Sequence, residues 1–202
     1  MKDEIIDQGR RQFFKETFSF VGNRIQEVVK DKIDIVSRKS PATNSETRRY
    51  IRPPGAVAEN EFLALCTKCD ECVKACPHKS IRTVNKDFDI SDGTPIIIPE
   101  ENPCYLCNGF PCISACKEGA LVEVKEKVDV AMGKAYINES HCMAWGAQFC
   151  EHCVRSCPVP GAIYQDDNRP FVNREKCVGC GICENVCNTV NQPIAIKVVP
   201  KQ

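Results

Sequence analysis

The stretch "CTKCDECVKACP", residues 66–77, decides the fold of this chain. Its cysteines Cys66, Cys69, Cys72 and Cys76 are separated by two, two and three residues, and a proline follows the last one. Three cysteines this close together on one loop can bind three iron corners of a cubane cluster, whereas the fourth points away from them. The spacing therefore predicts a loop that holds one [4Fe–4S] cluster and lends its fourth cysteine to a neighbouring cluster.

Three further stretches repeat this arrangement, so that the 16 cysteines form four groups of four with none left over. The second group is "CYLCNGFPCISAC" with Cys104, Cys107, Cys112 and Cys116; the third is "CMAWGAQFCEHCVRSCP" with Cys142, Cys150, Cys153 and Cys157; the fourth is "CVGCGICENVC" with Cys177, Cys180, Cys183 and Cys187. The fourth group has the spacing of the first, the second and third have longer loops, and all keep three residues before the last cysteine. The sequence thus predicts four [4Fe–4S] clusters, with all 16 cysteines as ligands.

Zinc and disulfides explain this pattern less well. Structural zinc sites use two separated C-x2-C pairs and need no third and fourth cysteine in register. Cysteines three residues apart on one loop are poorly placed for a disulfide, and frameworks rich in disulfides are mostly short secreted chains. The spacing therefore favours iron–sulfur clusters.

The bulk composition excludes two classes of partner. The chain has 202 residues with 27 basic and 27 acidic side chains, so phosphate neutralisation cannot drive it onto nucleic acid. Its apolar runs are far shorter than the ~18 residues that a membrane span requires. We expect no nucleic-acid binding and no transmembrane segment.

Short β-branched and aromatic runs flank the cysteine groups and predict small hairpins. The expected strands cover residues 80–84, 95–99, 120–124, 134–138, 162–166, 170–174 and 194–199. Short helices should begin in each cysteine loop and carry the fourth cysteine. The expected fold class is α+β, with two ferredoxin-like modules within residues 61–202.

The first sixty residues differ in character. Over residues 1–37, apolar side chains recur at intervals of three and four between charged ones, which predicts an amphipathic helix. Residues 38–60 are polar and contain prolines, which predicts an extended linker. The apolar stripe of the helix has three possible uses: packing on its own modules, docking on a partner subunit or a second copy, and binding a membrane surface.

The tracts "RPPGAVAENEFLALCTKCDECVKACP", "NPCYLCNGFPCISAC", "HCMAWGAQFCEHCVRSCP" and "KCVGCGICENVC" resemble the NapG/MauM ferredoxin-type family. The resemblance implies a four-cluster electron carrier, related to the small subunits of molybdenum and tungsten oxidoreductases. It also implies that the outer motifs, 61–100 and 167–202, form one module and that the inner motifs, 101–166, form the other. Spacing alone equally allows the first motif to pair with the second and the third with the fourth.

The ligand map implied by this resemblance assigns each cluster three cysteines from one motif and one from its partner motif. The four sets are Cys66, Cys69, Cys72 with Cys187; Cys177, Cys180, Cys183 with Cys76; Cys104, Cys107, Cys112 with Cys157; and Cys142, Cys150, Cys153 with Cys116. Lys117 and Asn188 stand where relatives usually have proline. A lysine beside a cluster favours its reduced form, so we expect Lys117 to raise one reduction potential modestly.

Four thiolates per cubane leave no iron open to substrate, so we expect an electron carrier and no catalytic residue. The favoured partner is the catalytic subunit of a larger oxidoreductase, such as a molybdenum or tungsten enzyme or a quinol-oxidising complex. Two alternatives stay open: a free-standing polyferredoxin that shuttles electrons, and a structural subunit that assembles through its N-terminal helix.

The segment "GRRQFFK", residues 9–15, resembles a twin-arginine export signal. A working signal needs an apolar region of ~7–15 residues and a small-residue cleavage site, whereas charged residues such as Glu16, Arg24 and Glu27 interrupt the segment that follows. We therefore expect a cytoplasmic protein, with a periplasmic or partner-mediated membrane location as the alternative.

Overall fold

The structure is a computed structural model that describes residues 50–83 and 93–201. The helix predicted over residues 1–37 and the first part of the predicted linker lie outside these residues. None of the helices in the described ranges is long and apolar enough to cross a membrane.

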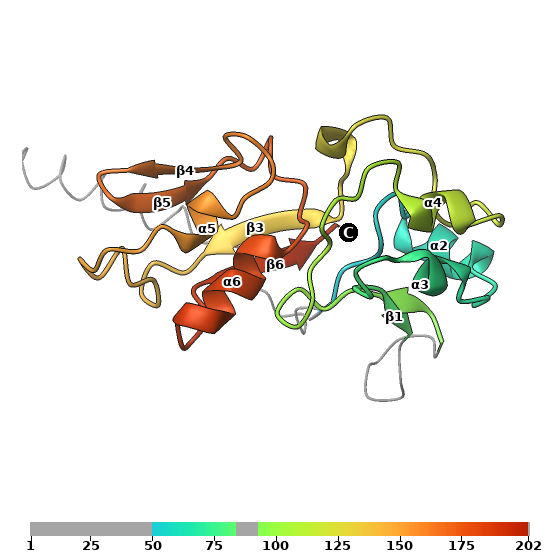
Figure 1. The fold of residues 1–202 in the computed structure, drawn as a ribbon, viewed down its shortest axis with the longest axis horizontal. Coiled ribbons are helices and arrows are strands. Elements are labelled where there is room, and N and C mark those ends of the chain that lie inside the picture. Colours follow the sequence, from blue (N-terminus) through green and yellow to red (C-terminus); the bar gives the residue numbers. More distant parts are fainter. Residues whose placement is uncertain (1–49, 84–92, 202) are drawn as a thin grey trace, which may run out of the picture. The chain divides into compact units, whose positions relative to one another are not determined.

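The described chain consists of short helices and short strands (Figure 1). In order they are α2 (Glu59–Leu65), α3 (Glu71–Ala75), β1 (Arg82–Thr83), β2 (Pro95–Ile96), α4 (Pro111–Ala115), the 3-10 helix η1 (Lys127–Asp129), β3 (Gly133–Ile137), α5 (His152–Arg155), β4 (Ile163–Asp166), β5 (Arg169–Val172), α6 (Ile182–Val190) and β6 (Ile196–Pro200). This mixture of small helices and hairpins is compatible with ferredoxin-like modules.

The strands of the described residues form three two-stranded antiparallel sheets, β1–β2, β3–β6 and β4–β5. Six of the seven predicted strands are present with shifted or shortened ends. The strand predicted over 120–124 is wrong, because only Leu121 pairs there, in an isolated bridge with Ala56. The neighbouring residues have few buried apolar side chains, with Val122 48% exposed, so a longer strand would gain little burial.

The β4–β5 hairpin follows directly from its sequence. Asp167 and Asn168 form its two-residue turn with φ values of 45° and 60°. A two-residue turn that matches the twist of its strands needs left-handed backbone at both positions, which Asp and Asn tolerate better than most residues. This turn places β5 back along β4 and leads the chain from the third cysteine motif to the fourth.

Residues 50–60 are pinned to the core rather than forming a free linker, so that part of the linker prediction is wrong. Ile51 pairs with Ile97 in an antiparallel bridge, with backbone hydrogen bonds of 2.8 Å in both directions. Arg52 is 8% exposed and donates hydrogen bonds of 3.1 Å and 2.6 Å to the carboxylate of Glu59. On α2, Phe62 is fully buried beneath the guanidinium of Arg52. The "RPPG" tract is therefore anchored by a buried ion pair and an apolar bridge.

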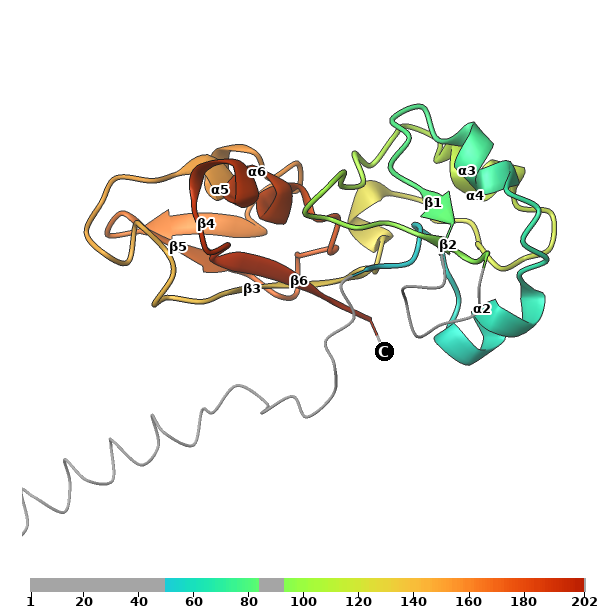
Figure 2. The same ribbon diagram turned by 90° about the horizontal axis from the view of Figure 1, so that it is seen from below.

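The helices pack in two neighbouring pairs, α3 with α4 and α5 with α6 (Figures 1 and 2). A hairpin lies between the partners in each case, β1–β2 in the first pair and β4–β5 in the second. The first and second motifs thus form one half of the described chain, and the third and fourth form the other. The predicted modules, outer motifs together and inner motifs together, are wrong because each hairpin folds a motif onto the next motif in sequence.

Strands β3 and β6 bracket the second half. They pair over five residues, from Gly133 with Pro200 to Ile137 with Ile196. Ala135, Ile196 and Val198 are buried on this ribbon, and α6 packs against β6. The ribbon therefore closes the third and fourth motifs into one unit although its strands are about sixty residues apart in sequence.

Candidate iron–sulfur sites

The cysteine loops use left-handed backbone around the second cysteine. In the first loop Lys68 and Asp70 flank Cys69 with φ values of 59° and 60°, and in the fourth loop Gly179 and Gly181 occupy the same places with 75° and 88°. Residues that alternate in this way turn successive backbone N–H groups toward a common point, which favours a bound anion. The loops are therefore shaped to surround a negatively charged group.

The helices present the third cysteine of each motif rather than the fourth. Cys72, Cys112 and Cys153 lie on α3, α4 and α5, and the fourth cysteine follows the end of each of these helices. Only α6 is long enough to carry both, with Cys183 and Cys187 one turn apart. The expectation that helices would carry all the fourth cysteines is wrong, because three of these helices have five residues or fewer.

The structure brings the cysteines together in four sites, each with three residues from one motif and one from the motif beside it in sequence. Site A is Cys66, Cys69, Cys72 and Cys116; site B is Cys104, Cys107, Cys112 and Cys76; site C is Cys177, Cys180, Cys183 and Cys157; site D is Cys142, Cys150, Cys153 and Cys187. The cysteines of sites A, B and D each line a cavity of their own.

These groupings correct the expected ligand map, which differed at the fourth cysteine of every set. Cys116 lies with the first motif where Cys187 was expected, and Cys76 lies with the second motif where Cys157 was expected. The reason is the packing of α3 on α4 and of α5 on α6, because a cysteine at the end of one helix reaches the loop that precedes its partner helix. The structure thus follows the pairing that spacing alone had left open.

Burial and mutual repulsion raise the pKa values of the clustered thiols. Burial raises the pKa of Cys72 to about 12, with further contributions from Cys66 and Cys116. The pKa of Cys153 is likewise raised to about 12 by burial and then by Cys142 and other cysteines of site D. Buried sulfurs that oppose one another's ionisation need a cationic centre to hold them as thiolates.

The thiols of site C also have raised pKa values. Burial first, and then Cys180 and Cys177, raise the pKa of Cys183 well above its ordinary value, and burial raises the pKa of Cys180 to about 11. Cys157 contributes to both shifts although it belongs to the third motif. Site C is therefore the most enclosed donor set of the four.

Contacts between neighbouring sites place them in the order A, B, C, D. Cys112 of site B adds to the raised pKa of Cys72 in site A, so these two sites adjoin. The backbone N–H of Cys104 donates a 3.0 Å hydrogen bond to the carbonyl oxygen of Cys180, which joins site B to site C across the two halves. Cys153 of site D adds to the raised pKa of Cys183 in site C.

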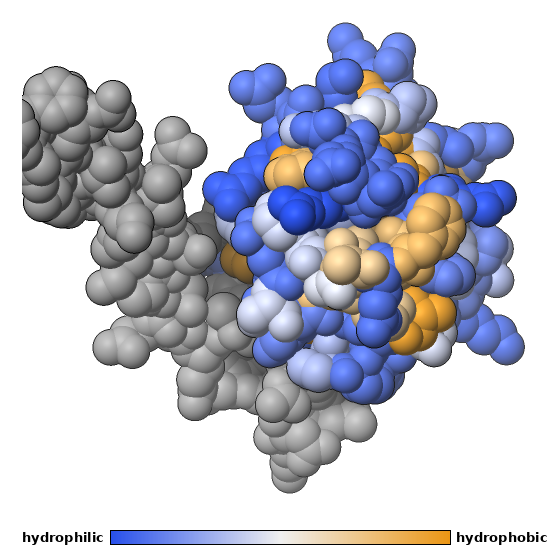
Figure 3. Space-filling view, turned by 90° about the vertical axis from the view of Figure 1, so that its left-hand side faces the viewer, coloured by the Kyte–Doolittle hydropathy of each residue, from blue (hydrophilic) through white to orange (hydrophobic). Residues whose placement is uncertain are grey.

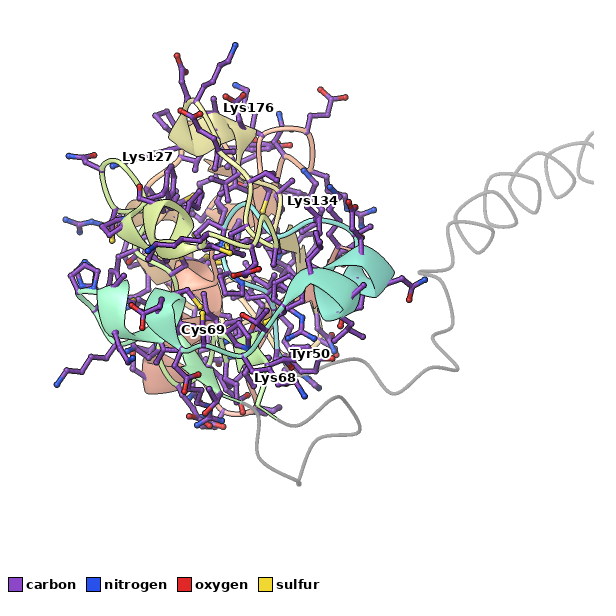
Figure 4. The ribbon with its side chains drawn as sticks, turned by 90° about the vertical axis from the view of Figure 1, so that its right-hand side faces the viewer. Tyr50, Lys68, Cys69, Lys127, Lys134 and Lys176 are labelled. Carbon is purple, nitrogen blue, oxygen red and sulfur yellow. The ribbon has the colours of Figure 1, made fainter. Side chains whose placement is uncertain are left out.

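Exposure of the cysteines rises from the middle of the row toward its first end. Three cysteines of site C are buried, namely Cys177, Cys180 and Cys183, as are two of site B. Site A has no buried cysteine, and its Cys69 is the one exposed cysteine among the residues that the structure describes. Figure 4 shows Cys69 beside Lys68 on the face at the right-hand side of Figure 1.

Site D, at the other end of the row, adjoins aromatic side chains. The ring of Trp145 contacts that of Phe171 edge-on at 5.4 Å between centroids, and Tyr164 stacks on Phe171 at 5.7 Å. Phe149, next to Cys150, is 76% exposed. Figure 3 shows hydrophobic side chains gathered among hydrophilic ones on the face at the β4–β5 end.

The donor sets fit iron–sulfur clusters. All 16 cysteines are free of disulfides, and within the described ranges no three Cys, His, Asp or Glu side chains converge on a point that one metal ion could occupy. Each site is instead a set of four separate sulfurs, as a cubane with one thiolate per iron requires. Backbone N–H groups also donate to cysteine sulfurs, among them Ser80 to Cys76, Ala135 to Cys177 and Ala195 to Cys187, at 3.3–3.4 Å.

Sequence reasoning missed several polar and charged groups that lie close to the ligand sulfurs. Ala135 donates to the sulfur of Cys177 across 42 residues, and Lys134 beside it donates to the carbonyl oxygen of Cys177. Glu184 is buried, accepts the N–H of Val198 at 2.7 Å, and has its pKa raised to about 7 by burial. No local pattern marks Lys134 and Ala135, because strand β3 brings them to Cys177 from about forty residues away. Glu184 directly follows Cys183, but its burial depends on the packing of α6 against β6.

Comparison with known proteins gives consistent matches. A family model described as a 4Fe-4S binding domain matches residues 168–189. The chain is 33% identical over 206 residues to the ferredoxin-type protein NapG of Escherichia coli (strain K12), covering 95% of this chain and 86% of NapG.

Two other relatives extend the match. The chain is 38% identical over 164 residues to the methylamine utilization ferredoxin-type protein MauM of Paracoccus denitrificans (strain Pd 1222), covering 76% of this chain and 72% of MauM. It is 29% identical over 145 residues to the ferredoxin-type protein NapF of E. coli, covering 68% of this chain and 79% of NapF. No solved structure matches.

Proposed function

The chain belongs to the NapG/MauM-type ferredoxin family and is an iron–sulfur electron-transfer protein; from this premise we propose that it holds four [4Fe–4S] clusters in a row and relays electrons to or from a larger oxidoreductase. The order of sites A, B, C and D is the observation that carries this proposal. The bound clusters would supply one-electron redox chemistry, and the 16 cysteines would be their ligands.

The protein's own residues would set the spacing of the row. The hydrogen bond from the N–H of Cys104 to the carbonyl oxygen of Cys180 ties a ligand loop of site B to one of site C. Within each half, the paired helices exchange their fourth cysteines, so neighbouring sites share the same two helices. This interlocking would hold adjacent redox centres at fixed separation, which a relay requires.

Burial would separate site A, which has no buried cysteine, from the other three sites. Site C excludes water from most of its sulfurs, whereas site A exposes Cys69. An electron carrier needs at least one centre near its surface, and buried centres within it are protected from side reactions with solvent. We propose that site A exchanges electrons with a partner and that sites B and C conduct between the halves.

The partner in this proposal is the catalytic subunit of a molybdenum or tungsten enzyme or of a quinol-oxidising complex. The name of the MauM relative ties that protein to methylamine utilization, whereas the NapG relative is named only as a ferredoxin-type protein. Membership of the family therefore supports a role in electron transfer and does not identify the substrate of the partner enzyme. Native co-purification tests the partner: a stoichiometric large redox subunit supports the proposal, and a monomeric holoprotein supports a free-standing shuttle instead.

Residues 1–45 bear on location and assembly within this proposal. We propose a cytoplasmic location, because charged residues interrupt the segment that follows the paired arginines. We also propose that the amphipathic stripe of residues 1–37 docks on the partner. A fusion of residues 1–45 to a reporter tests the first point: retention supports it and export overturns it. Deletion of residues 1–37 tests the second, since the truncated chain should lose its partner and keep its iron.

A further inference from the structure

Lys134 places a cation against the backbone of a cysteine loop. Its ammonium donates a 2.7 Å hydrogen bond to the carbonyl oxygen of Cys177 in a partly buried position. By contrast, the ammonium of Lys74 meets the carboxylate of Glu71 at the exposed surface. Among the residues that the structure describes, no carboxylate oxygen lies within 4.0 Å of the Lys134 nitrogen. Its positive charge is therefore left to act on site C.

The strand that carries Lys134 is fixed to this loop by close contacts. The N–H of Met132 donates to the carbonyl oxygen of Val178 at 3.0 Å, and the N–H of Ala135 donates to the sulfur of Cys177 at 3.4 Å. A Cβ atom on Gly179 would lie 2.4 Å from the backbone nitrogen of Gly133, so strand and loop are in direct backbone contact. The ammonium thus keeps a constant place relative to the sulfurs.

The other lysines near the sites are less enclosed. Lys117 follows Cys116 of site A, Lys127 acts on Cys107 of site B, and both side chains are exposed to solvent. Solvent and salt screen an exposed charge, whereas a partly buried one acts through a lower effective dielectric. The lysine identified from sequence, Lys117, should therefore affect its site less than Lys134 affects site C. Figure 4 labels Lys127 and Lys134 at separate places.

A fixed positive charge favours the more negative oxidation state of a neighbouring redox centre. We propose that Lys134 raises the reduction potential of site C above the value that this site would have without the charge. This inference rests on the proposed function, because it requires a cluster at site C. It assigns β3 a second role: the strand that closes the fold also tunes the centre next to the junction between the halves.

The test is a redox titration of the holoprotein followed by EPR, comparing Lys134→Met and Lys134→Arg with the unsubstituted chain. At the ambient potential where site C is half reduced in the unsubstituted protein, Lys134→Met should lower its reduced-to-oxidised ratio about tenfold. For a one-electron couple this corresponds to about 59 mV. Lys134→Arg keeps the charge and should stay within about twofold, and the control Lys117→Met should leave this centre unchanged.

Three results would overturn the proposal: an unchanged ratio in Lys134→Met, an equal shift in Lys134→Arg, or loss of one cluster's iron in Lys134→Met. The second and third would show that the side chain positions the loop rather than tuning its potential. Where the methionine variant fails to fold, Lys134→Gln, which keeps a hydrogen-bond donor without the charge, takes its place. The iron content of the unsubstituted protein separates this proposal from the proposed function: four clusters with no shift in Lys134→Met overturn only the role of Lys134, whereas fewer than four clusters in the unsubstituted protein overturn the four-cluster relay.

Discussion

Gly179 is the position where the contact between β3 and site C can be tested most sharply. Replacing it with alanine puts a Cβ atom 2.4 Å from the backbone nitrogen of Gly133 and 2.5 Å from its carbonyl carbon and oxygen. These are backbone atoms, so no side-chain rotation relieves the clash. Gly179 also has φ of +75°, where a residue with a Cβ costs about 1–2 kcal/mol.

The expected loss of stability follows from what must move. Separating the loop from β3 breaks the hydrogen bond from Met132 to Val178 and the one from Ala135 to the sulfur of Cys177. At about 1 kcal/mol each, these add to the backbone cost and give about 3–4 kcal/mol in total. Gly119→Ala is the matched control, since Gly119 has φ of +74° but no atom within 4 Å of its would-be Cβ. The control should lose only about 1–2 kcal/mol.

The assay is the rate of cluster release from the holoprotein in guanidinium, followed by the iron–sulfur absorption. The difference of about 2 kcal/mol between the variants corresponds to about a thirtyfold difference in rate if site C opens before release. Equal rates for Gly179→Ala and Gly119→Ala would refute the view that β3 clamps the loop of site C.

Three further outcomes follow from single groups. Burial raises the pKa of Glu184 to about 7, above its ordinary 4.5. The contribution of this side chain to stability is therefore full below pH 4.5 and is lost as the pH rises through 7. The loss is at most roughly 3 kcal/mol. We expect the unsubstituted protein to release its clusters faster at pH 8 than at pH 6. Glu184→Gln keeps an acceptor for the N–H of Val198 and should abolish this difference; an unaltered pH dependence in the variant contradicts the prediction. Because Cys69 is exposed, brief chelation followed by alkylation and mass spectrometry should label site A first, and earlier labelling of site C would count against the burial order. Arg52→Met removes the two hydrogen bonds that Arg52 donates to the carboxylate of Glu59 and the one to the carbonyl oxygen of Pro95, which should cost about 3 kcal/mol and lower the thermal midpoint by roughly 10 °C; a shift under 2 °C would show that the pair is not structural.

The cysteine pattern made much of the molecule predictable. Spacing alone indicated four ligand loops, and the structure gathers the 16 cysteines into four sets of four. The hairpins were also accessible from sequence, because runs such as residues 162–166 and 170–174 flank a turn of Asp167 and Asn168 whose backbone preferences are local. Structural features that depend on residues close together in the chain can be predicted from a single sequence.

The partner of each fourth cysteine could not be obtained in this way. All four motifs keep the same offset before the last cysteine, so Cys76 is compatible with any neighbouring loop until the helices are packed. The family resemblance suggested outer with outer, whereas the β1–β2 and β4–β5 hairpins bring adjacent motifs together. The pairing of motifs depends on how short helices pack. A helix of five residues is too short to show a hydrophobic period in the sequence, so this packing could not be predicted.

The sequence could not show which charged groups lie close to the sites, for a related reason. Lys117 follows Cys116 directly in the sequence, yet it is exposed, whereas Lys134 lies 43 residues from Cys177 and contacts its carbonyl oxygen. The predicted linker failed at residues 50–60 because Ile51 and Arg52 find partners far along the chain. Proximity in sequence is a poor guide to the electrostatics of a fold closed by long-range strand pairs.

The pairing of motifs is tested most directly by counting intact clusters in two double variants. In Cys66→Ala/Cys116→Ala both substitutions fall in site A, so one cluster should be damaged and about three intact [4Fe–4S] clusters should remain, as counted by Mössbauer spectroscopy and iron analysis. In Cys66→Ala/Cys187→Ala the substitutions fall in sites A and D, so about two should remain. Three intact clusters in the second variant and two in the first would contradict the account and restore the outer-with-outer map.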